Sequence, residues 1–161
     1  MSIYTSTTAA TERSSSAIDT ALLCLRLALG LVFMVHGAQL VFGAFGGPGI
    51  VNFAKMMGPL GYLVAIGEFF GGLGIVVGFL SRFSAAALIV IMLGAIIKVH
   101  LPNGFFMNWY GKQAGEGYEY HLLVIGMALT LLIAGPGRFA VGRFLPLPKV
   151  SDTNQPVPAI E

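Results

Sequence analysis

The chain alternates between long apolar stretches and short breaks that are rich in glycine, proline or charge. The apolar stretches cover residues 19–42, 60–80, 83–101 and 119–134. An apolar helix of about 20 residues crosses the hydrocarbon core of a bilayer, and polar side chains at the ends of the two shorter stretches can extend to the headgroups. The pattern predicts an all-α membrane protein, a bundle of four transmembrane helices.

The break after the first apolar stretch contains a further short element. Residues 43–49 (GAFGGPG) are expected to end the first helix, because glycine and proline disfavour helical conformation. Residues 50–57 (IVNFAKMM) then place Asn52 and Lys55 three positions apart among apolar residues. This spacing predicts a short helix in the membrane interface, between the first and second spans.

Two later breaks define how the remaining spans are connected. Ser81 and Arg82 form a very short predicted turn, which requires the second and third spans to be antiparallel neighbours. Residues 102–118 form a predicted loop with five aromatic residues, a composition typical of the boundary between bilayer and water.

Both ends of the chain are expected to lie outside the bundle as polar tails. Nine of residues 2–16 are Ser or Thr, so residues 1–18 are expected to form a mobile tail. Ser16 and Asp19 have the spacing of a capping box, which predicts that the first helix begins near residue 19. Four prolines after Phe144 predict a stiff tail over residues 145–161. Residues 19–144 remain as a single transmembrane domain.

Composition supports the membrane assignment and excludes other classes of protein. Charged residues make up 10 % of the chain, against about 25 % in soluble proteins, and hydrophobic residues make up 56 %. The mean hydropathy is +0.83. The net charge of +2 is too small and scattered for a nucleic-acid-binding surface. Because Cys24 is the only cysteine, an internal disulfide and a cysteine-built zinc site are excluded.

Basic residues predict how the bundle is oriented. With the N-terminus inside, the outer half contains only Lys55, Lys98 and Lys112. Lys and Arg accumulate on the cytoplasmic side of membrane proteins, so the sequence predicts a multi-pass protein of the cytoplasmic (inner) membrane with both termini cytoplasmic. The basic residues of the inner half are Arg13, Arg26, Arg82, Arg138, Arg143 and Lys149.

Polar side chains from all four spans fall in one layer of the outer leaflet. A rise of about 1.5 Å per residue places His36 roughly 22 Å above the inner end of its span. The same rise places Glu68 roughly 12 Å below the outer end of its span, a similar depth in a core of about 30 Å. Since a charge inside a bilayer is costly unless it is paired or hydrated, Glu68 and His36 are the candidate catalytic residues.

These two residues suit proton exchange with a bound ligand. A carboxylate accepts a proton or a hydrogen bond from a quinol hydroxyl, and a nearby imidazole passes the proton on. Six further residues are candidates for binding a cofactor in a polar pocket that opens to the outer face. They are Arg26, Gln39, Lys98, His100, Glu119 and His121.

Structural roles stay open for several of these residues. Lys98, His100, Glu119 and His121 lie near helix ends, where they can reach the interface or satisfy one another. Arg26 lies near the inner boundary and either pairs with Asp19 or belongs to the site. The sequence assigns no metal ligands, because no two histidines have ligand spacing within one helix. Glycines at positions 67, 71, 74 and 78 share one face of the second span and predict close helix packing.

Short motifs follow one another in a specific order and spacing along the chain. They are Arg26-Leu27-Ala28-Leu29-Gly30 before His36-Gly37, Gly67-Glu68 before Gly71-Gly72, Ser81-Arg82-Phe83-Ser84-Ala85, Met92 with Ala95, Glu119-Tyr120, and Gly135-Pro136-Gly137-Arg138. Over about residues 22–140 they resemble the DoxX family of small four-helix bacterial membrane proteins. Family members often carry lysine four residues after the histidine of the first span, where this chain has Leu40.

The resemblance implies a membrane subunit of a quinone-linked oxidoreductase or of a complex that protects against oxidative or thiol stress. Quinone or quinol would then be a non-covalent ligand. The chain has no cysteine cluster and no glycine-rich nucleotide loop, so a partner subunit would carry the electron-transfer cofactor. The expected partners are the lipid bilayer and other membrane or peripheral redox subunits. A homo-oligomer stays open, and nucleic acid is not expected.

Two other functions remain alternatives. One is a non-enzymatic assembly or scaffold subunit, in which the polar layer locks the bundle and the glycine face docks a partner. The other is a carrier of a small polar solute or proton, in which Glu68 titrates.

Overall fold

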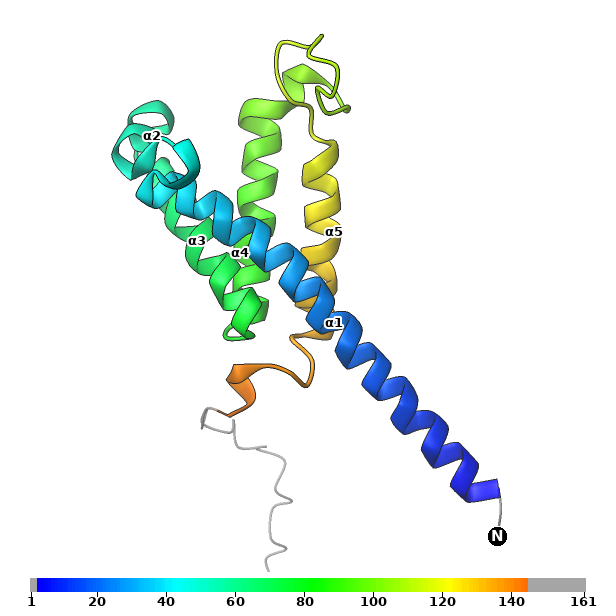
Figure 1. Cartoon of the computed structure of the whole chain (residues 1–161). Helices are drawn as coiled ribbons and strands as arrows, with labels where there is room; N and C mark the ends of the chain where they lie inside the picture. Colours follow the sequence, from blue (N-terminus) through cyan, green and yellow to red (C-terminus); the bar gives the residue numbers. More distant parts are fainter. Residues whose placement is uncertain (1–2, 145–161) are drawn as a thin grey trace, which may run out of the picture.

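The computed structural model describes residues 3–144, with side chains from residue 15 onward. These residues form helices and turns, and the described part of the chain contains no β-strand. The α-helices are α1 (Ile3–Phe42), α2 (Gly49–Met57), α3 (Leu60–Val77), α4 (Ser81–Ala95) and α5 (Glu119–Ala134), shown in Figure 1. The prediction of an all-α fold is confirmed.

Three helical segments are long and apolar enough to cross a membrane. They are Ser15–Phe42 of α1, the whole of α3, and Ser81–Asn103, in which α4 continues through a π turn and a 3₁₀ turn. Helix α5 is a shorter apolar helix. Large apolar side chains such as Leu63, Val90 and Ile133 are exposed on the outside of the bundle, as lipid-facing residues are. The fold is a helical membrane bundle, as predicted.

The first helix is longer than predicted. Helix α1 begins at Ile3 rather than near residue 19, so the described part of the expected N-terminal tail is helical. Ser16 lies inside this helix, where its carbonyl accepts a hydrogen bond of 2.9 Å from the Thr20 hydroxyl, and the predicted capping box is therefore wrong. Once the apolar span is helical, each further residue adds one hydrogen bond without a new nucleation step. The predicted C-terminal tail, residues 145–161, lies outside the described residues.

Glycines in the left-handed conformation mark the breaks between helices. Gly43, with φ 71°, follows the last residue of α1, and α2 matches the short helix predicted over residues 50–57. Gly78, with φ 76°, ends α3, and its amide bonds to carbonyls of the last helical turn. The turn between α3 and α4 therefore lies at residues 78–80. Ser81 and Arg82, predicted as the turn, are instead the first two residues of α4.

The helices are arranged as two pairs that join through α3 and α4. Helix α1 runs along α3, and α5 runs along α4 (Figure 1). Residues 135–144 pass beneath the start of the span in α1 and the end of α3, and we call this end of the molecule the inner end. The segments 43–59 and 101–118 lie at the opposite, outer end (Figure 1). The described spans therefore begin and end on the same side, which requires an even number of crossings.

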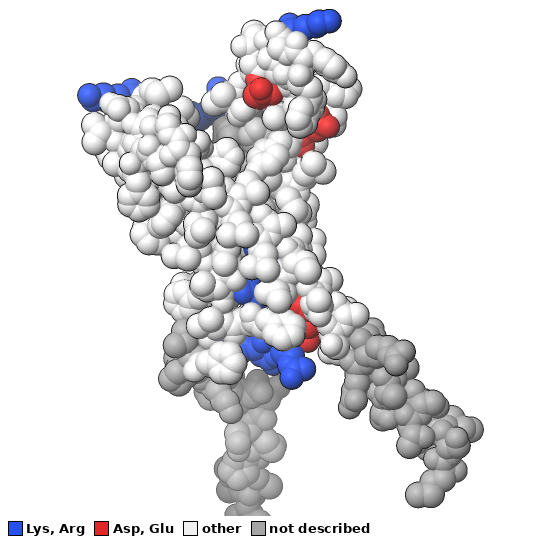
Figure 2. All heavy atoms as spheres, in the orientation of Figure 1, with Lys and Arg blue, Asp and Glu red and all other residues white. Residues whose placement is uncertain are grey.

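At the outer end the two helix pairs separate into two arms. The first arm consists of α2 and the outer halves of α1 and α3, and the second consists of the outer halves of α4 and α5 with the loop between them. Figure 2 shows a notch between these arms. It also shows Lys and Arg gathered near the two ends of the molecule, with a nearly uncharged band between them, as expected for a protein that crosses lipid.

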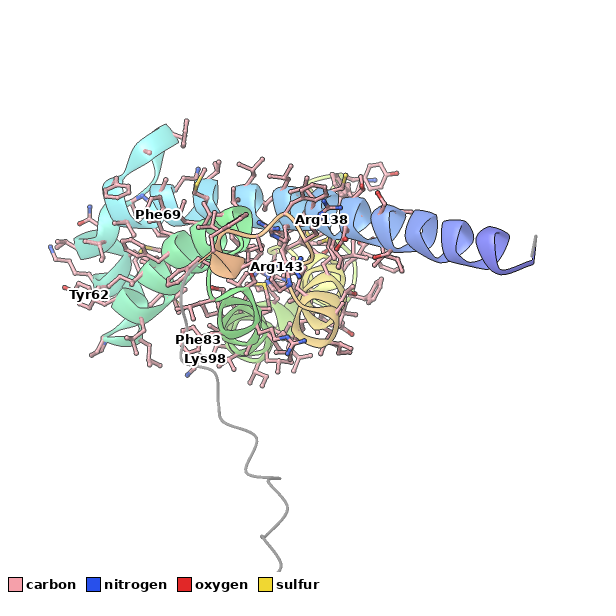
Figure 3. All side chains as sticks on the ribbon, turned by 90° about the horizontal axis from the view of Figure 1, so that it is seen from below. Tyr62, Phe69, Phe83, Lys98, Arg138 and Arg143 are labelled. Atoms are coloured by element: carbon pink, nitrogen blue, oxygen red, sulfur yellow. The ribbon has the colours of Figure 1, made fainter. Side chains whose placement is uncertain are left out.

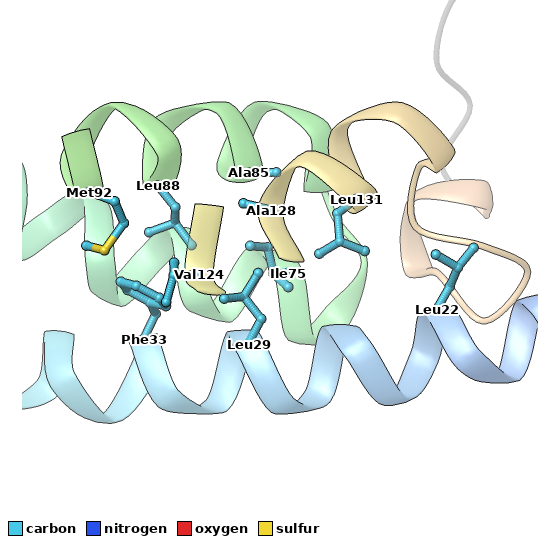
Figure 4. Packing of buried hydrophobic residues seen from close by; sticks show 10 residues of the cluster. All are labelled: Leu22, Leu29, Phe33, Ile75, Ala85, Leu88, Met92, Val124, Ala128 and Leu131. Atoms are coloured by element: carbon cyan, nitrogen blue, oxygen red, sulfur yellow. The ribbon is translucent and has the colours of Figure 1, made fainter. Parts of the chain in front are cut away.

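The apolar core occupies the inner half and the middle of the bundle. Figure 4 shows its ten buried residues, which come from all four spans. Phe33, Met92 and Val124 form its outer end, and polar residues begin above them. The ten residues are Leu22, Leu29, Phe33, Ile75, Ala85, Leu88, Met92, Val124, Ala128 and Leu131.

Glycines allow α3 to approach both of its neighbours. A Cβ atom built on Gly72 would lie 2.5 Å from the Met34 amide nitrogen of α1, and Gly37 of α1 is as tightly packed against Phe69. On the α4 side, Gly67 faces Ile91 and Gly71 faces Leu88. The predicted close packing of the glycine row is confirmed, but the tightest contact is the one between α1 and α3.

Candidate functional site

Glu68 lies inside the bundle, immediately outward of the apolar core. It shares the buried face of α3 with Ala65 and Gly72, and its residue surface is only 9 % exposed. Among residues 15–144, no side chain donates a hydrogen bond to its carboxylate. The Tyr120 phenol of α5 lies within Coulombic range of that carboxylate. A buried acid is normally paired or hydrogen-bonded, so the Glu68 carboxylate has acceptor positions that no described side chain fills.

His36 lies at the height predicted for it, but its side chain is exposed. Its neighbour Gly37 packs against Phe69, which places His36 level with Glu68. Two helical turns separate His36 from Leu29, so both point to the same side of α1. Leu29 is covered by the core, whereas His36 lies where the arms have separated and is left uncovered. The sequence predicted the depth correctly, and it could not show the separation of the arms.

Two histidines meet at the outer end of the second arm. The rings of His100, from the π turn Ile96–His100, and His121, from α5, are 4.1 Å apart and tilted by 46°. The Nδ1 atom of His100 is 2.8 Å from the Glu116 carbonyl oxygen. His121 is buried, and its Nδ1 atom has no hydrogen-bond partner among the described residues. The ring of Tyr120 stands edge-on to His121 at 5.8 Å.

Glu119 organises the outer loop rather than facing Glu68. Its Oε2 atom accepts a hydrogen bond of 3.2 Å from the Met107 amide. The Glu116 carbonyl likewise accepts a hydrogen bond from the Asn103 side chain, and its carboxylate accepts one from the Asn108 amide. These contacts give the loop a defined shape. For Glu119 the structure supports the structural alternative over the cofactor-binding one.

Lys98 and Gln39 are not part of the buried polar group. Lys98 is exposed on the π turn, and Figure 3, seen from the inner end, shows it pointing outward from the bundle. No cation from the third span therefore replaces the lysine that family members often carry at the position of Leu40. Gln39 is half-buried beside Gly47. Its backbone carbonyl accepts a hydrogen bond from the amide of Gly43, the residue after the end of α1.

Arg26 lies at the inner end, far from Glu68, and is almost fully buried. Its guanidinium donates four hydrogen bonds of 2.7–3.0 Å, to the carbonyls of Ile75 and Val76 in α3 and of Pro136 and Phe139 beyond α5. The predicted pair with Asp19 is not formed, and Arg26 lies apart from the residues around Glu68. The Asp19 carboxylate instead accepts the Arg138 amide at 2.8 Å. A cation is well placed against the carbonyl end of α3, where the helix dipole is negative.

Some site features were not anticipated from the sequence. Tyr120 was noted only as part of a motif, although an aromatic phenol next to a histidine at a helix start is a readable signal. The loop carbonyl of Glu116 gives no signal at all, because every residue has one. Within the described residues, no three His, Cys, Asp or Glu side chains gather as a group able to hold a metal ion.

These features define a helical integral membrane protein with a largely buried glutamate, Glu68, on the inward face of α3. The DoxX family model matches residues 21–101, a segment that includes α2, α3, α4 and most of the first span. The chain belongs to the DoxX family, as its motifs predicted. The matched segment ends before α5, so it is shorter than the resemblance expected over residues 22–140.

One relative of similar length supports this assignment. The chain is 30 % identical over 139 residues to the uncharacterized membrane protein Rv3486 of Mycobacterium tuberculosis. The match covers 76 % of this chain and 80 % of the relative. No solved structure matches the chain.

Proposed function

We propose that this protein is a small subunit of a quinone-linked oxidoreductase or stress-protective redox complex, and that it binds a quinol headgroup next to Glu68. The observation that supports this most directly is Glu68 itself, a residue only 9 % exposed on the inward face of α3 whose carboxylate receives no hydrogen bond from a described side chain. Leaving such a group without a partner is costly in a low-dielectric interior. A ligand that supplies a hydroxyl would remove that cost.

The surroundings of Glu68 fit a lipid-soluble ligand with a polar head. The Tyr120 phenol of α5, which interacts electrostatically with Glu68, offers a second hydrogen-bonding group. The notch between the arms lies beside exposed apolar faces of the helices, so an isoprenoid tail can remain in the lipid. His36, exposed on α1 at the level of Glu68, offers a further polar group to a ligand that enters there.

Electrons from the quinol would pass to a cofactor on a partner subunit. For that reason the protein is proposed to act within a complex in the cytoplasmic membrane. The same proposal places the inner end, with Arg82, Arg138 and Arg143, on the cytoplasmic side, because basic residues favour that side.

The test is direct measurement of quinone binding by the purified protein in lipid nanodiscs. Solvent extraction and chromatography should reveal co-purified quinone, and titration with decylubiquinol and menadiol should give saturable binding. Glu68→Gln should weaken binding by about 10- to 100-fold, since a hydrogen bond to a charged group contributes about 1.5–3 kcal/mol. Thr130→Val, on the exposed side of α5, is the matched control and should bind as the wild type does.

Two results would contradict the proposal. The first is a folded wild-type protein that contains no quinone and binds neither analogue. The second is a Glu68→Gln variant that melts at the wild-type temperature, binds with unchanged affinity and restores a deletion strain. Either result favours the scaffold function, in which the polar layer only stabilises the bundle.

A further inference from the structure

Side chains able to transfer protons lie between Glu68 and the outer end of the second arm. Tyr120 lies within Coulombic range of Glu68, its ring contacts His121 edge-on, and the His121 ring lies 4.1 Å from that of His100. His100 is half-buried and bonded to the outer loop through the Glu116 carbonyl. The row therefore begins at the buried acid and ends at residues that contact water.

The π turn is what brings His100 into this row. The buried residues Ala85, Leu88 and Met92 set the inward face of α4, and an uninterrupted α-helix would place Val99 on that face. The π turn Ile96–His100 adds one residue to the turn, so His100 points inward and Val99 is exposed. Single π turns inside α-helices occur frequently at functional sites.

His121 has a free hydrogen-bonding position where a structural histidine would have none. Its residue is 6 % exposed, and its buried Nδ1 atom has no partner among the described residues. Buried polar atoms are satisfied in the great majority of cases. An imidazole with one open nitrogen can take a proton on one side of the ring and release one from the other.

We infer that Tyr120, His121 and His100 form the route by which protons pass between the outer aqueous phase and Glu68. This inference rests on the proposed function, because it supplies the protons of that site. In each transfer, His100 takes a proton from water, one imidazole hands a proton to the next group, and the Tyr120 hydroxyl gives its proton to the carboxylate while receiving another. One proton is moved, and no other bond changes.

Several charged and titratable groups lie near the histidine pair. Glu116 and Glu119 lie at the junction of loop and α5 and are engaged by the Asn108 and Met107 amides. Lys98, on the π turn, is exposed and points outward from the bundle. Tyr118 stacks edge-on with Phe105 in the loop. Glu68 is the acid at the inner end of the row, and the one described acid farther inward, Asp19, accepts the Arg138 amide.

The experiment measures how fast Glu68 gains a proton, in the absence of any quinone. Purified protein in nanodiscs is exposed to a laser-induced drop in pH, and time-resolved infrared spectroscopy follows the carbonyl band of the protonated carboxyl. The band is assigned by its absence in Glu68→Gln. We expect His121→Phe and Tyr120→Phe each to slow its appearance at least tenfold. Tyr110→Phe, on the exposed part of the loop, is the control and should leave the rate unchanged.

Each outcome is decisive. Unchanged rates in both Tyr120→Phe and His121→Phe would overturn the route, and so would a Glu68 that gains no proton after the pH drop. If His121→Phe fails to fold, Tyr120→Phe still decides, because it removes only a hydroxyl. Slowed protonation in a protein that binds no quinol would support the route and refute the proposed function, so the two failures are distinguishable.

Discussion

The contact between α1 and α3 allows a quantitative test at a single glycine. In Gly72→Ala, the new methyl group would lie 2.5 Å from the Met34 amide nitrogen and 2.8 Å from the Gly30 carbonyl oxygen. An ordinary contact of a Cβ atom is 3.4–4 Å. The obstacles are backbone atoms, which cannot rotate away, so the two helices must separate by about 1 Å in this region.

That separation affects more than one contact. Gly30 and Gly37 are packed against α3 as closely as Gly72 is packed against α1, so all three contacts loosen together. Overpacking of this kind costs about 1–3 kcal/mol, while alanine gains up to about 1 kcal/mol over glycine in helix propensity. We expect a net loss of about 1–2 kcal/mol for Gly72→Ala. In the double variant with Gly30→Ala the loss should be less than additive, because the helices are already apart.

The neighbouring glycine provides the control. A Cβ atom on Gly71 would lie 3.7 Å from the nearest atom of Leu88, which is ordinary contact. Gly71→Ala should therefore be neutral or stabilising. The assay is the melting temperature of purified protein in one detergent, together with the amount inserted in membranes. Equal melting temperatures for the two variants would refute the reasoning, because they would show that α1 and α3 do not meet at Gly72.

Three further predictions concern the ends of the bundle. Arg26→Lys keeps the charge, but one ammonium group cannot reach carbonyls on both α3 and the 136–139 segment. The free energy of unfolding in detergent should therefore fall by at least about 2 kcal/mol. A wild-type melting temperature would count against the four hydrogen bonds of Arg26. Glu119→Ala should free the Met107 amide and destabilise the loop by about 1 kcal/mol, seen as faster proteolysis there than in Lys112→Ala. In a Cys24→Ala background, a cysteine at Lys112 should be labelled from outside intact cells and one at Asp152 should not; labelling of Asp152→Cys would reverse the proposed orientation.

The positions of the helices could be predicted from the sequence because particular residue types, glycine and proline, occur where helices end. Glycine and proline mark the breaks at residues 43–49 and 58–59, and the predicted fourth span matches α5. The burial of Glu68 could also be predicted, since it is the one acid in a long apolar run. The polar N-terminal residues gave no comparable signal. They lack an apolar pattern, yet they continue a helix that the following span has already nucleated.

The relations between helices could not be predicted in the same way. His36 was placed at the correct height, but its exposure depends on the angle at which the two arms separate. The inward position of His100 depends on one π turn, and no residue type in the sequence indicates such a turn. The partners of Arg26 are backbone carbonyls, which every residue has, so no residue type indicates them. The predicted partner, Asp19, instead accepts the Arg138 amide.

The hydrogen bonds of Arg26 also bear on the order in which the bundle assembles. The guanidinium belongs to α1, whereas its partners belong to elements later in the chain, the end of α3 and the segment after α5. A nascent chain with only its first helix in the bilayer therefore carries an unsatisfied cation in lipid, which is unfavourable. Half of its partners arrive with α3, and the other half arrive only when α5 has been inserted and the chain has turned back beneath α1. Helix α1 thus stays incompletely bound until residues 136–139 have been synthesised, and a chain truncated before Pro136 keeps a buried charge with half of its partners.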